Sequence, residues 1–338
     1  MELFNVAILG ATGLVGQNFL DVLAEREFPV GNLYPLASAR SAGGTVTFKG
    51  KQLEVLDAAT FDWSQVQIAL FSAGGSVSAE YAPKAAAAGC IVIDNTSHFR
   101  YDQDVPLIVP EVNPLAIDDY DKRNIIANPN CSTIQMVVAL KPIHDAVGIT
   151  RINVATYQSV SGAGQQGIEA LARETTSLLN GRPIEGSGKF NRQIAFNVIP
   201  QIDVFMDNGY TKEEMKMVWE TRKIFGDDSI MVNATCVRVP VFFGHAEAVH
   251  IETASPISVE KVKDLLRDAP GVVLMENDAD FPTQVGDAQG QDAVYVGRIR
   301  QDISHPCGLN LWIVADNARK GAATNAVQIA ELLVRDCL

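Results

Sequence analysis

No apolar run in the chain reaches the roughly 18 to 20 residues that a membrane-spanning helix needs. The first residues, MELFNVAILGATG, carry no basic segment, and their short apolar run leads directly into a glycine turn, which does not fit a signal peptide. We therefore expect a cytoplasmic protein without a membrane partner.

Cysteine is scarce, and its spacing argues against two further classes of protein. The five cysteines are an odd number without CxxC spacing, which disfavours a disulfide framework and a zinc site. The histidines form no HxxxH pair, so we expect no metal. The cysteines are Cys90, Cys131, Cys236, Cys307 and Cys337.

Basic residues are outnumbered, since 27 Lys and Arg stand against 40 Asp and Glu, a formal net charge of -13. This charge disfavours binding to nucleic acid, and a small anionic substrate would need a local cluster of cations. The length of 338 residues suggests two domains. With 47% hydrophobic and 20% charged residues, the composition is that of an ordinary globular protein.

A glycine pattern stands at the start of the chain. In NVAILGATGLVGQNFLDVLAERE an apolar run to Leu9 predicts a strand, and the apolar spacing after the second glycine predicts a helix. In this context glycines let the backbone approach a pyrophosphate at the helix N-terminus. A tight turn without a ligand is the alternative. The predicted cofactor contacts are Gly10, Ala11, Thr12, Gly13, Leu14, Val15 and Gly16.

The next two strand candidates refine the choice of cofactor. An NAD-selective site usually has Asp or Glu after its second strand, but here NLYPLAS leads to Arg40 and Ser41, which suit a 2′-phosphate. We therefore predict NADP(H), with a solvated arginine as the alternative. The strand QIALFSAGG ends in Ser72, Ala73 and Gly74, small residues beside which a cofactor can pass.

Strands and helices alternate along the first part of the chain, which predicts a doubly wound parallel sheet. Ligands bind at the carboxyl ends of the strands of such a sheet. Asn95 and Arg100 lie at and just after the end of the strand CIVIDN, so both are candidates for the site.

Cys131 is the one cysteine whose surroundings suggest reactivity. Asn128-Pro129-Asn130 cannot continue a strand, and STIQMVVALKPI from Ser132 onward predicts a mostly buried helix. A helix N-terminus lowers the pKa of a thiol, and its free N–H groups can stabilise an oxyanion. These local residues leave a nucleophile and a buried apolar thiol equally open.

Two further strand-like segments carry polar candidates. RINVATYQ leads to Gln158, whose amide could orient a substrate carbonyl, and Ser161 and Gly162 open a small-residue loop suited to a nicotinamide. A solvent-facing glutamine and an ordinary turn are equally open. Arg238 lies within an apolar strand, where an unpaired charge is unfavourable, so we expect it to face a cleft and an anion.

His245 and His250 lie five residues apart. Residues an odd number apart in a strand point to opposite faces, so at most one of these histidines lines a site. The segment GYTKEEMKMVWETRKIFG predicts an amphipathic helix with Glu213 and Lys216 as i, i+3 neighbours. Taken alone, this segment is best interpreted as a solvated helix with surface ion pairs.

Together these motifs resemble those of the aspartate-β-semialdehyde dehydrogenases, in order and over nearly the whole chain. The resemblance rests on GATGLVG, LASARSAG, NPNCST, TYQSVSGAG, EEMKM, ETRKI, RVPVFFGHAEAV and the C-terminal stretch beginning VGRIRQDISHPCGLNLW. It implies an NADP-dependent, phosphorylating aldehyde dehydrogenase that reductively dephosphorylates L-aspartyl 4-phosphate to L-aspartate 4-semialdehyde through a cysteine thioester. This step leads to lysine, through diaminopimelate, and to threonine, methionine and isoleucine.

The resemblance also implies a role for each candidate residue. Cys131 resembles the family's nucleophile, His245 its acid/base and partner of the thiolate, and Gln158 its substrate-orienting amide. Arg238 resembles the arginine that binds the substrate carboxylate. The implied phosphate and substrate contacts are Arg100, Asn95, Lys216 and Glu213, and the cofactor contacts extend to Ser161, Gly162 and Asn317.

The implied α/β fold is a Rossmann-type dinucleotide-binding domain with a second α+β catalytic and dimerisation domain, as in glyceraldehyde-3-phosphate dehydrogenase. We place the NADP-binding domain at 1–127 plus 320–338 and the catalytic domain at 128–319. The insertion 178–203 then fits a subunit-contact arm of a homodimer or homotetramer. One alternative is an N-acetyl-γ-glutamyl-phosphate reductase, whose cysteine typically precedes an aromatic residue and a proline, unlike the Ser-Thr found here. The other is a catalytically silent paralogue that acts as a binding or scaffold protein.

Overall fold

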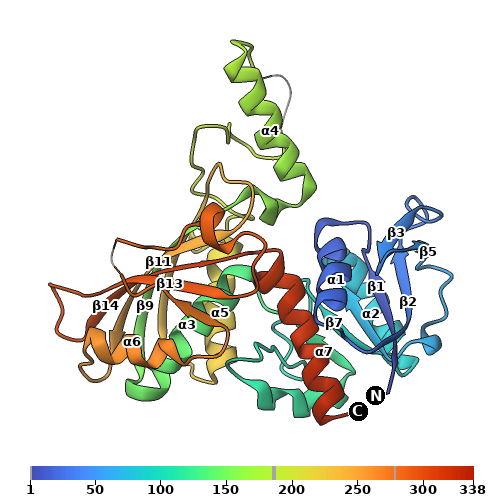
Figure 1. The fold of residues 1–338 in the computed structure, drawn as a ribbon, viewed down its shortest axis with the longest axis horizontal. Coiled ribbons are helices and arrows are strands. Elements are labelled where there is room, and N and C mark those ends of the chain that lie inside the picture. Colours follow the sequence, from blue (N-terminus) through green and yellow to red (C-terminus); the bar gives the residue numbers. More distant parts are fainter. Residues whose placement is uncertain (1, 185–187, 278) are drawn as a thin grey trace. The chain divides into compact units, whose positions relative to one another are not determined.

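The computed structural model describes residues 2–184, 188–277 and 279–338. The chain divides into two compact units, one formed by Met1–Asn130 with Gly321–Leu338 and the other by Cys131–Lys320. Figure 1 shows the helices and strands of both units. Among the helices within the described ranges, none is long and apolar enough to cross a bilayer.

The first unit is built on a six-stranded parallel sheet with the order β5-β2-β1-β6-β7-β8. The chain moves outward from β1 to β2 and then returns to the other side of β1 with β6, so the order reverses between β1 and β6. Its elements are β1 (Phe4–Leu9), α1 (Leu14–Glu25), β2 (Val30–Ala37), the hairpin β3 (Thr45–Phe48) and β4 (Lys51–Glu54), β5 (Leu56–Asp57), β6 (Ile68–Phe71), α2 (Gly75–Ala87), β7 (Ile91–Asp94), β8 (Ile125–Ala127) and α7 (Thr324–Asp336).

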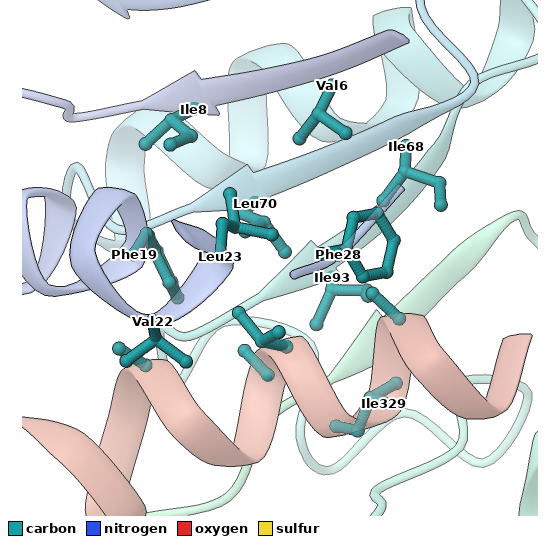
Figure 2. Packing of buried hydrophobic residues seen from close by; sticks show 14 of the residues in the cluster. Val6, Ile8, Phe19, Val22, Leu23, Phe28, Ile68, Leu70, Ile93 and Ile329 are labelled. Atoms are coloured by element: carbon teal, nitrogen blue, oxygen red, sulfur yellow. The ribbon is translucent and has the colours of Figure 1, made fainter. Parts of the chain in front are cut away.

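The core of this unit joins the two ends of the chain. Val6 and Ile8 of β1, Phe19 of α1 and Ile329 of the C-terminal helix α7 belong to one buried apolar cluster (Figure 2). These side chains are fully buried. Removal of so much apolar surface from water is the main force that holds α7 against the parallel sheet.

The second unit contains a mixed six-stranded sheet with the order β10-β9-β11-β14-β13-β12. Helices α3, α5 and α6 pack on one face of this sheet (Figure 1). Its elements are α3 (Cys131–Val147), β9 (Ile149–Gln158), α4 (Gln165–Leu179), α5 (Lys212–Phe225), β10 (Met231–Arg238), β11 (His245–Thr253), α6 (Val259–Arg267), β12 (Val272–Leu274), β13 (Val294–Gln301) and β14 (Gly308–Ala315).

The register of three neighbouring strands brings three predicted site residues into one row. Gln158, the last residue of β9, pairs with Arg238 at the end of β10 and with His245 at the start of β11. Because residues directly opposite each other in neighbouring strands share a face of the sheet, the three side chains start from adjacent positions on one face. The fold thus brings Gln158 beside two residues, Arg238 and His245, that lie 80 or more positions later in the sequence.

The predicted fold class is confirmed. A Rossmann-type parallel sheet is followed by an α+β unit with a mixed sheet, and the predicted helix after Asn130 is present as α3. One interpretation is wrong: α5 is not a solvated helix with only surface ion pairs. Glu213, Glu214 and Glu220 on this helix are all buried, with exposed fractions of 5%, 8% and 0%.

Candidate active site

The row formed by Arg238, Gln158 and His245 is buried and covered by a loop of small residues. Arg238 Nη1 donates a hydrogen bond of 2.6 Å to the carbonyl oxygen of Ser159. A methyl group added to Gly162 would lie 2.8 Å from Arg238 Nη1 and 3.2 Å from His245 Nε2. A larger residue at this position would therefore displace the end of the Arg238 side chain.

His245 has one ring nitrogen occupied and one available. The backbone N–H of Ser159 donates to His245 Nδ1 at 3.1 Å, so Nδ1 is the unprotonated nitrogen and Nε2 carries the hydrogen of the neutral ring. Nε2 has no hydrogen-bond partner within the described chain. His245 is fully buried, and burial, followed by the charge of Arg238, lowers its pKa to about 3. This pKa favours a neutral proton donor over the imidazolium that would pair with a thiolate.

Cys131 is the first residue of α3 and is partly exposed. Its thiol and the guanidinium of Arg238 interact electrostatically. The cation and the helix N-terminus are the groups that can stabilise a thiolate at this position. Cys90 and Cys236, by contrast, are buried, and burial raises the pKa of Cys90 to about 12 and that of Cys236 well above its ordinary value.

Glu213 and Lys216 belong to a chain of polar contacts that starts at the same row. Gln158 Nε2 donates to Glu213 Oε1 at 3.1 Å, and Lys216 Nζ donates to Glu213 Oε2 at 2.9 Å and to Asp203 Oδ2 at 2.8 Å. Burial alone would lower the pKa of Lys216, but the charge of Glu213 and the hydrogen bonds of both carboxylates raise it overall. Lys216 therefore stays charged and forms ion pairs with both carboxylates.

The burial of α5 has a specific cause. Glu214 accepts hydrogen bonds from the backbone N–H groups of Thr211, at 2.7 Å, and Cys236, at 3.0 Å. The first of these closes a capping box at the helix N-terminus. The glutamates on this helix thus bind backbone and amide groups of other elements rather than water.

A cavity of about 320 Å³ opens beside Arg238. Lys189, Asn191 and Asp203 supply polar groups to its wall, and Phe190 places its ring 6.0 Å from the guanidinium of Arg238. Most of these residues come from the insertion 178–203, so the described part of that insertion lines a cavity. Its residues 185–187 lie outside the described residues.

The predicted cofactor residues of the first unit lie where β1 and β6 end. Gly10 has a φ of 92°, and a Cβ there would lie 2.7 Å from the carbonyl oxygen of Ser72. A Cβ on Gly16 would lie 2.1 Å from the carbonyl oxygen of Gly10. Gly13 caps α1 without a side-chain hydrogen bond. This close-packed turn at a helix N-terminus fits a dinucleotide pyrophosphate.

The remaining predictions are distributed over both units. In the first unit, Arg40 is exposed after β2, and buried Arg100 donates to the carbonyl oxygen of Asn95 at 2.9 Å. In the second unit, Oδ1 of Asn317 accepts hydrogen bonds from Ser159 Oγ, Ser161 Oγ and the N–H of Gly244, at 3.0 to 3.1 Å. Asn317 therefore holds the two loops that flank His245. Within the described ranges, no group of three or more His, Cys, Asp or Glu residues could hold a metal ion.

Sequence reasoning missed the residues that support this row. Ser159 acts on His245 and Arg238 mainly through its backbone, which no side-chain pattern reveals. Glu247 is fully buried on the same face of β11 as His245. The period of two in GHAEAVHI could have indicated it, because an acidic residue two positions after a buried histidine shares its face.

Comparison with known proteins agrees with this geometry. The family model of the semialdehyde dehydrogenase NAD binding domain matches residues 5–120, and that of the semialdehyde dehydrogenase dimerisation domain matches residues 140–320. Fold and site together thus define the class of semialdehyde dehydrogenases.

Individual relatives narrow this class. Aspartate-semialdehyde dehydrogenase 2 of Vibrio cholerae is 70% identical over 333 residues, which are 98% of this chain and 98% of that protein. The crystal structure of aspartate semialdehyde dehydrogenase II complexed with ASA, also from Vibrio cholerae, has a TM-score of 0.99 at 69% identity and covers 100% of both chains. The aspartate semialdehyde dehydrogenase of Candida albicans, solved with NADP, has a TM-score of 0.77 at 26% identity and covers 98% of this chain and 99% of that one. The chain belongs to the aspartate-semialdehyde dehydrogenase family.

Proposed function

We propose that the protein catalyses the NADPH-dependent reductive dephosphorylation of L-aspartyl 4-phosphate to L-aspartate 4-semialdehyde, in the cytoplasm. The observation that carries this proposal is the register row of Arg238, Gln158 and His245 next to the helix that begins with Cys131. A carboxylate-binding cation, a carbonyl-orienting amide, a proton donor and a thiol are the groups that this reaction needs in one place.

In the proposed mechanism the Cys131 thiolate attacks the acyl phosphate carbon, and the N–H groups at the start of α3 stabilise the oxyanion that forms. Arg238 binds the substrate carboxylate, and Gln158 orients the carbonyl. Phosphate leaves, aided by the positive charges of Lys216 and Arg100, and a thioester remains on Cys131. Asn95 and Glu213 complete the proposed phosphate and substrate contacts.

The proton chemistry is assigned to His245. Its Nε2–H is neutral and has no partner within the described chain, so it can donate a hydrogen bond to the oxyanion that forms when the thioester is reduced. That oxyanion then collapses to the aldehyde and the Cys131 thiolate. NADPH, when bound, supplies the hydride that reduces the thioester. The glycine turn after β1, with Ser72, Ala73 and Gly74 after β6, would hold its pyrophosphate.

We further infer that the protein is a homodimer, because residues 140–320 match a dimerisation domain. A tetramer is the alternative assembly, and light scattering of the purified protein distinguishes the two by mass. Its substrates are small anions, and neither nucleic acid nor a membrane has a role in the proposal.

The function is tested by the reverse reaction. The purified protein is expected to reduce NADP with aspartate semialdehyde only when inorganic phosphate is present. N-acetylglutamate semialdehyde, the substrate of the related reductases, is measured beside it. If folded protein turns over only the acetylated substrate, or neither substrate, the proposed function is wrong.

A first prediction concerns the preference for NADP. Arg40 follows β2 and is exposed, where its charge can meet a 2′-phosphate. Replacement of Arg40 by alanine is expected to raise KM for NADP by roughly 10- to 100-fold, the value of one or two charge-assisted hydrogen bonds. KM for NAD should stay within about threefold, so steady-state kinetics with both cofactors separate a 2′-phosphate contact from a general loss of binding. An equal change for both cofactors would contradict this role.

A further inference from the structure

A second acidic group lies in the core behind His245. Glu247 follows His245 by two residues on β11 and is fully buried. Neither of its carboxyl oxygens has a hydrogen-bond partner of good geometry within the described chain. Burial raises the pKa of Glu247 well above its ordinary value, so the group is a neutral carboxylic acid at neutral pH.

In the part of the chain that the structure describes, no positive charge acts on the pKa of this carboxyl. Its neighbours in register are Thr156 on β9 and Ile313 on β14, and Gln135 reaches it from α3. The titratable groups nearby are His245 on its own strand, which the low pKa keeps neutral, and Cys236 on β10, whose own raised pKa keeps it a thiol. Among the described residues, only the nearby amide of Gln135 opposes the effect of burial on the pKa of Glu247.

Gln135 can supply the hydrogen-bond acceptor for the protonated carboxyl of Glu247. Its Oε1 is buried and has no partner within the described chain, while its Nε2 donates to the backbone carbonyl oxygen of His245 at 3.4 Å. An acid that keeps its proton has one O–H to donate, and an amide oxygen is a good acceptor. One O–H···O bond between Glu247 and Gln135 would satisfy two otherwise unmatched buried atoms.

Gln135 also connects this acid to the nucleophile. It lies four residues after Cys131 on α3, one turn along the same face of the helix. The bond from Gln135 Nε2 to the His245 carbonyl therefore connects the helix that begins with Cys131 to the strand that begins with His245. Packing alone does not require an acid here, because a buried carboxyl without an ionic partner is less favourable than an apolar side chain of similar size.

We propose that Glu247 is a positioning residue that donates its acid proton to Gln135 Oε1 and thereby holds His245 in register with Cys131. The proposal deepens, and rests on, the proposed function for its effect on turnover. The second part of the proposal, that Glu247 keeps its proton in the folded chain, can be tested without any enzymatic activity.

Three variants test the effect on turnover. In Glu247→Gln the amide N–H can still donate to Gln135, so kcat should stay within about threefold of the parent. In Glu247→Met the bond is lost at similar volume, and kcat should fall by roughly 10- to 100-fold with KM for the semialdehyde within about threefold, as expected for a small misplacement of reacting groups. Val249→Ala, two residues further along the same buried face of β11, should lower the melting temperature yet leave kcat within about threefold. An unchanged kcat in Glu247→Met would overturn the positioning role.

The protonation state is tested by thermal unfolding. Because the pKa of Glu247 is raised in the folded chain, the unfolded chain ionises first, and folding loses stability as pH rises above about 4.5. The variant Glu247→Gln has no carboxyl to ionise and lacks this loss. The difference in melting temperature, variant minus parent, should therefore increase from about pH 5 to about pH 8. If this difference instead shrinks with rising pH, Glu247 is not a neutral acid in the folded chain, and this conclusion holds even for a protein that oxidises no semialdehyde. A carboxylic-acid C=O band that is present in the parent's infrared spectrum and absent from Glu247→Gln would support it.

Discussion

Replacement of Cys131 by alanine is expected to lower kcat by roughly 10⁴-fold or more, because the covalent intermediate of the proposed mechanism forms on the thiol of this residue. Three of the four other cysteines are unsuited to this role: Cys90 and Cys236 are buried with raised pKa values, and burial also raises the pKa of Cys337. The thiol starts a helix of the second unit, whereas the predicted glycine turn belongs to the first. NADP binding should therefore stay within about threefold of the parent, the range of an unperturbed site.

Turnover is measured by phosphate-dependent reduction of NADP, and cofactor affinity by titration calorimetry. Cys307→Ala is the matched control, because Cys307 is also partly exposed and its side chain has no partner among the described contacts. The Cys307→Ala variant should keep its activity, and a thiol reagent should still inactivate it. If Cys131→Ala retains substantial turnover, another residue is the nucleophile and the proposed mechanism fails.

Local patterns in the sequence predicted the framework of the molecule. The apolar run before Gly10 and the helical spacing after it could be identified without tertiary information, and both elements are present as β1 and α1. Pro129 and its flanking asparagines predicted that a strand ends where α3 begins. The strand period of two also predicted that at most one of the two histidines lines the site, and Nε2 of His250 instead forms a hydrogen bond of 2.8 Å with Asp302 Oδ2.

The supporting contacts could not be predicted in the same way. On α5, Glu213 and Glu214 are compatible with a solvated helix face, because the groups that satisfy them lie on β9 and β10. The hydrogen bond that sets the tautomer of His245 comes from a backbone N–H 86 residues away. Such partners are defined by the register of three strands, which depends on packing of the whole mixed sheet rather than on any one segment.

Replacement of His245 by asparagine has the second-largest expected effect. Asparagine can still accept the hydrogen bond from the N–H of Ser159, but it lacks the second ring nitrogen that faces Gly162. Loss of a positioned proton donor should lower kcat by roughly 10²- to 10⁴-fold. KM for aspartate semialdehyde should change much less, because Arg238 is retained. The measurement is steady-state kinetics of the phosphate-dependent reaction in both variant and parent.

His250→Asn is the control, because His250 points to the other face of the same strand and should leave kcat within about threefold. A second measurement tests the pKa that makes His245 a neutral donor. This pKa is lowered to about 3 in the folded chain from an ordinary 6.5. Between these two pH values the histidine is protonated in the unfolded chain but not in the folded chain, so the parent loses stability as pH falls from 6.5 towards 3. His245→Asn lacks this part of the loss, so its stability relative to the parent should rise on acidification. If it instead falls, the folded protein holds a histidinium, and a thiolate–imidazolium pair with Cys131 replaces the neutral donor.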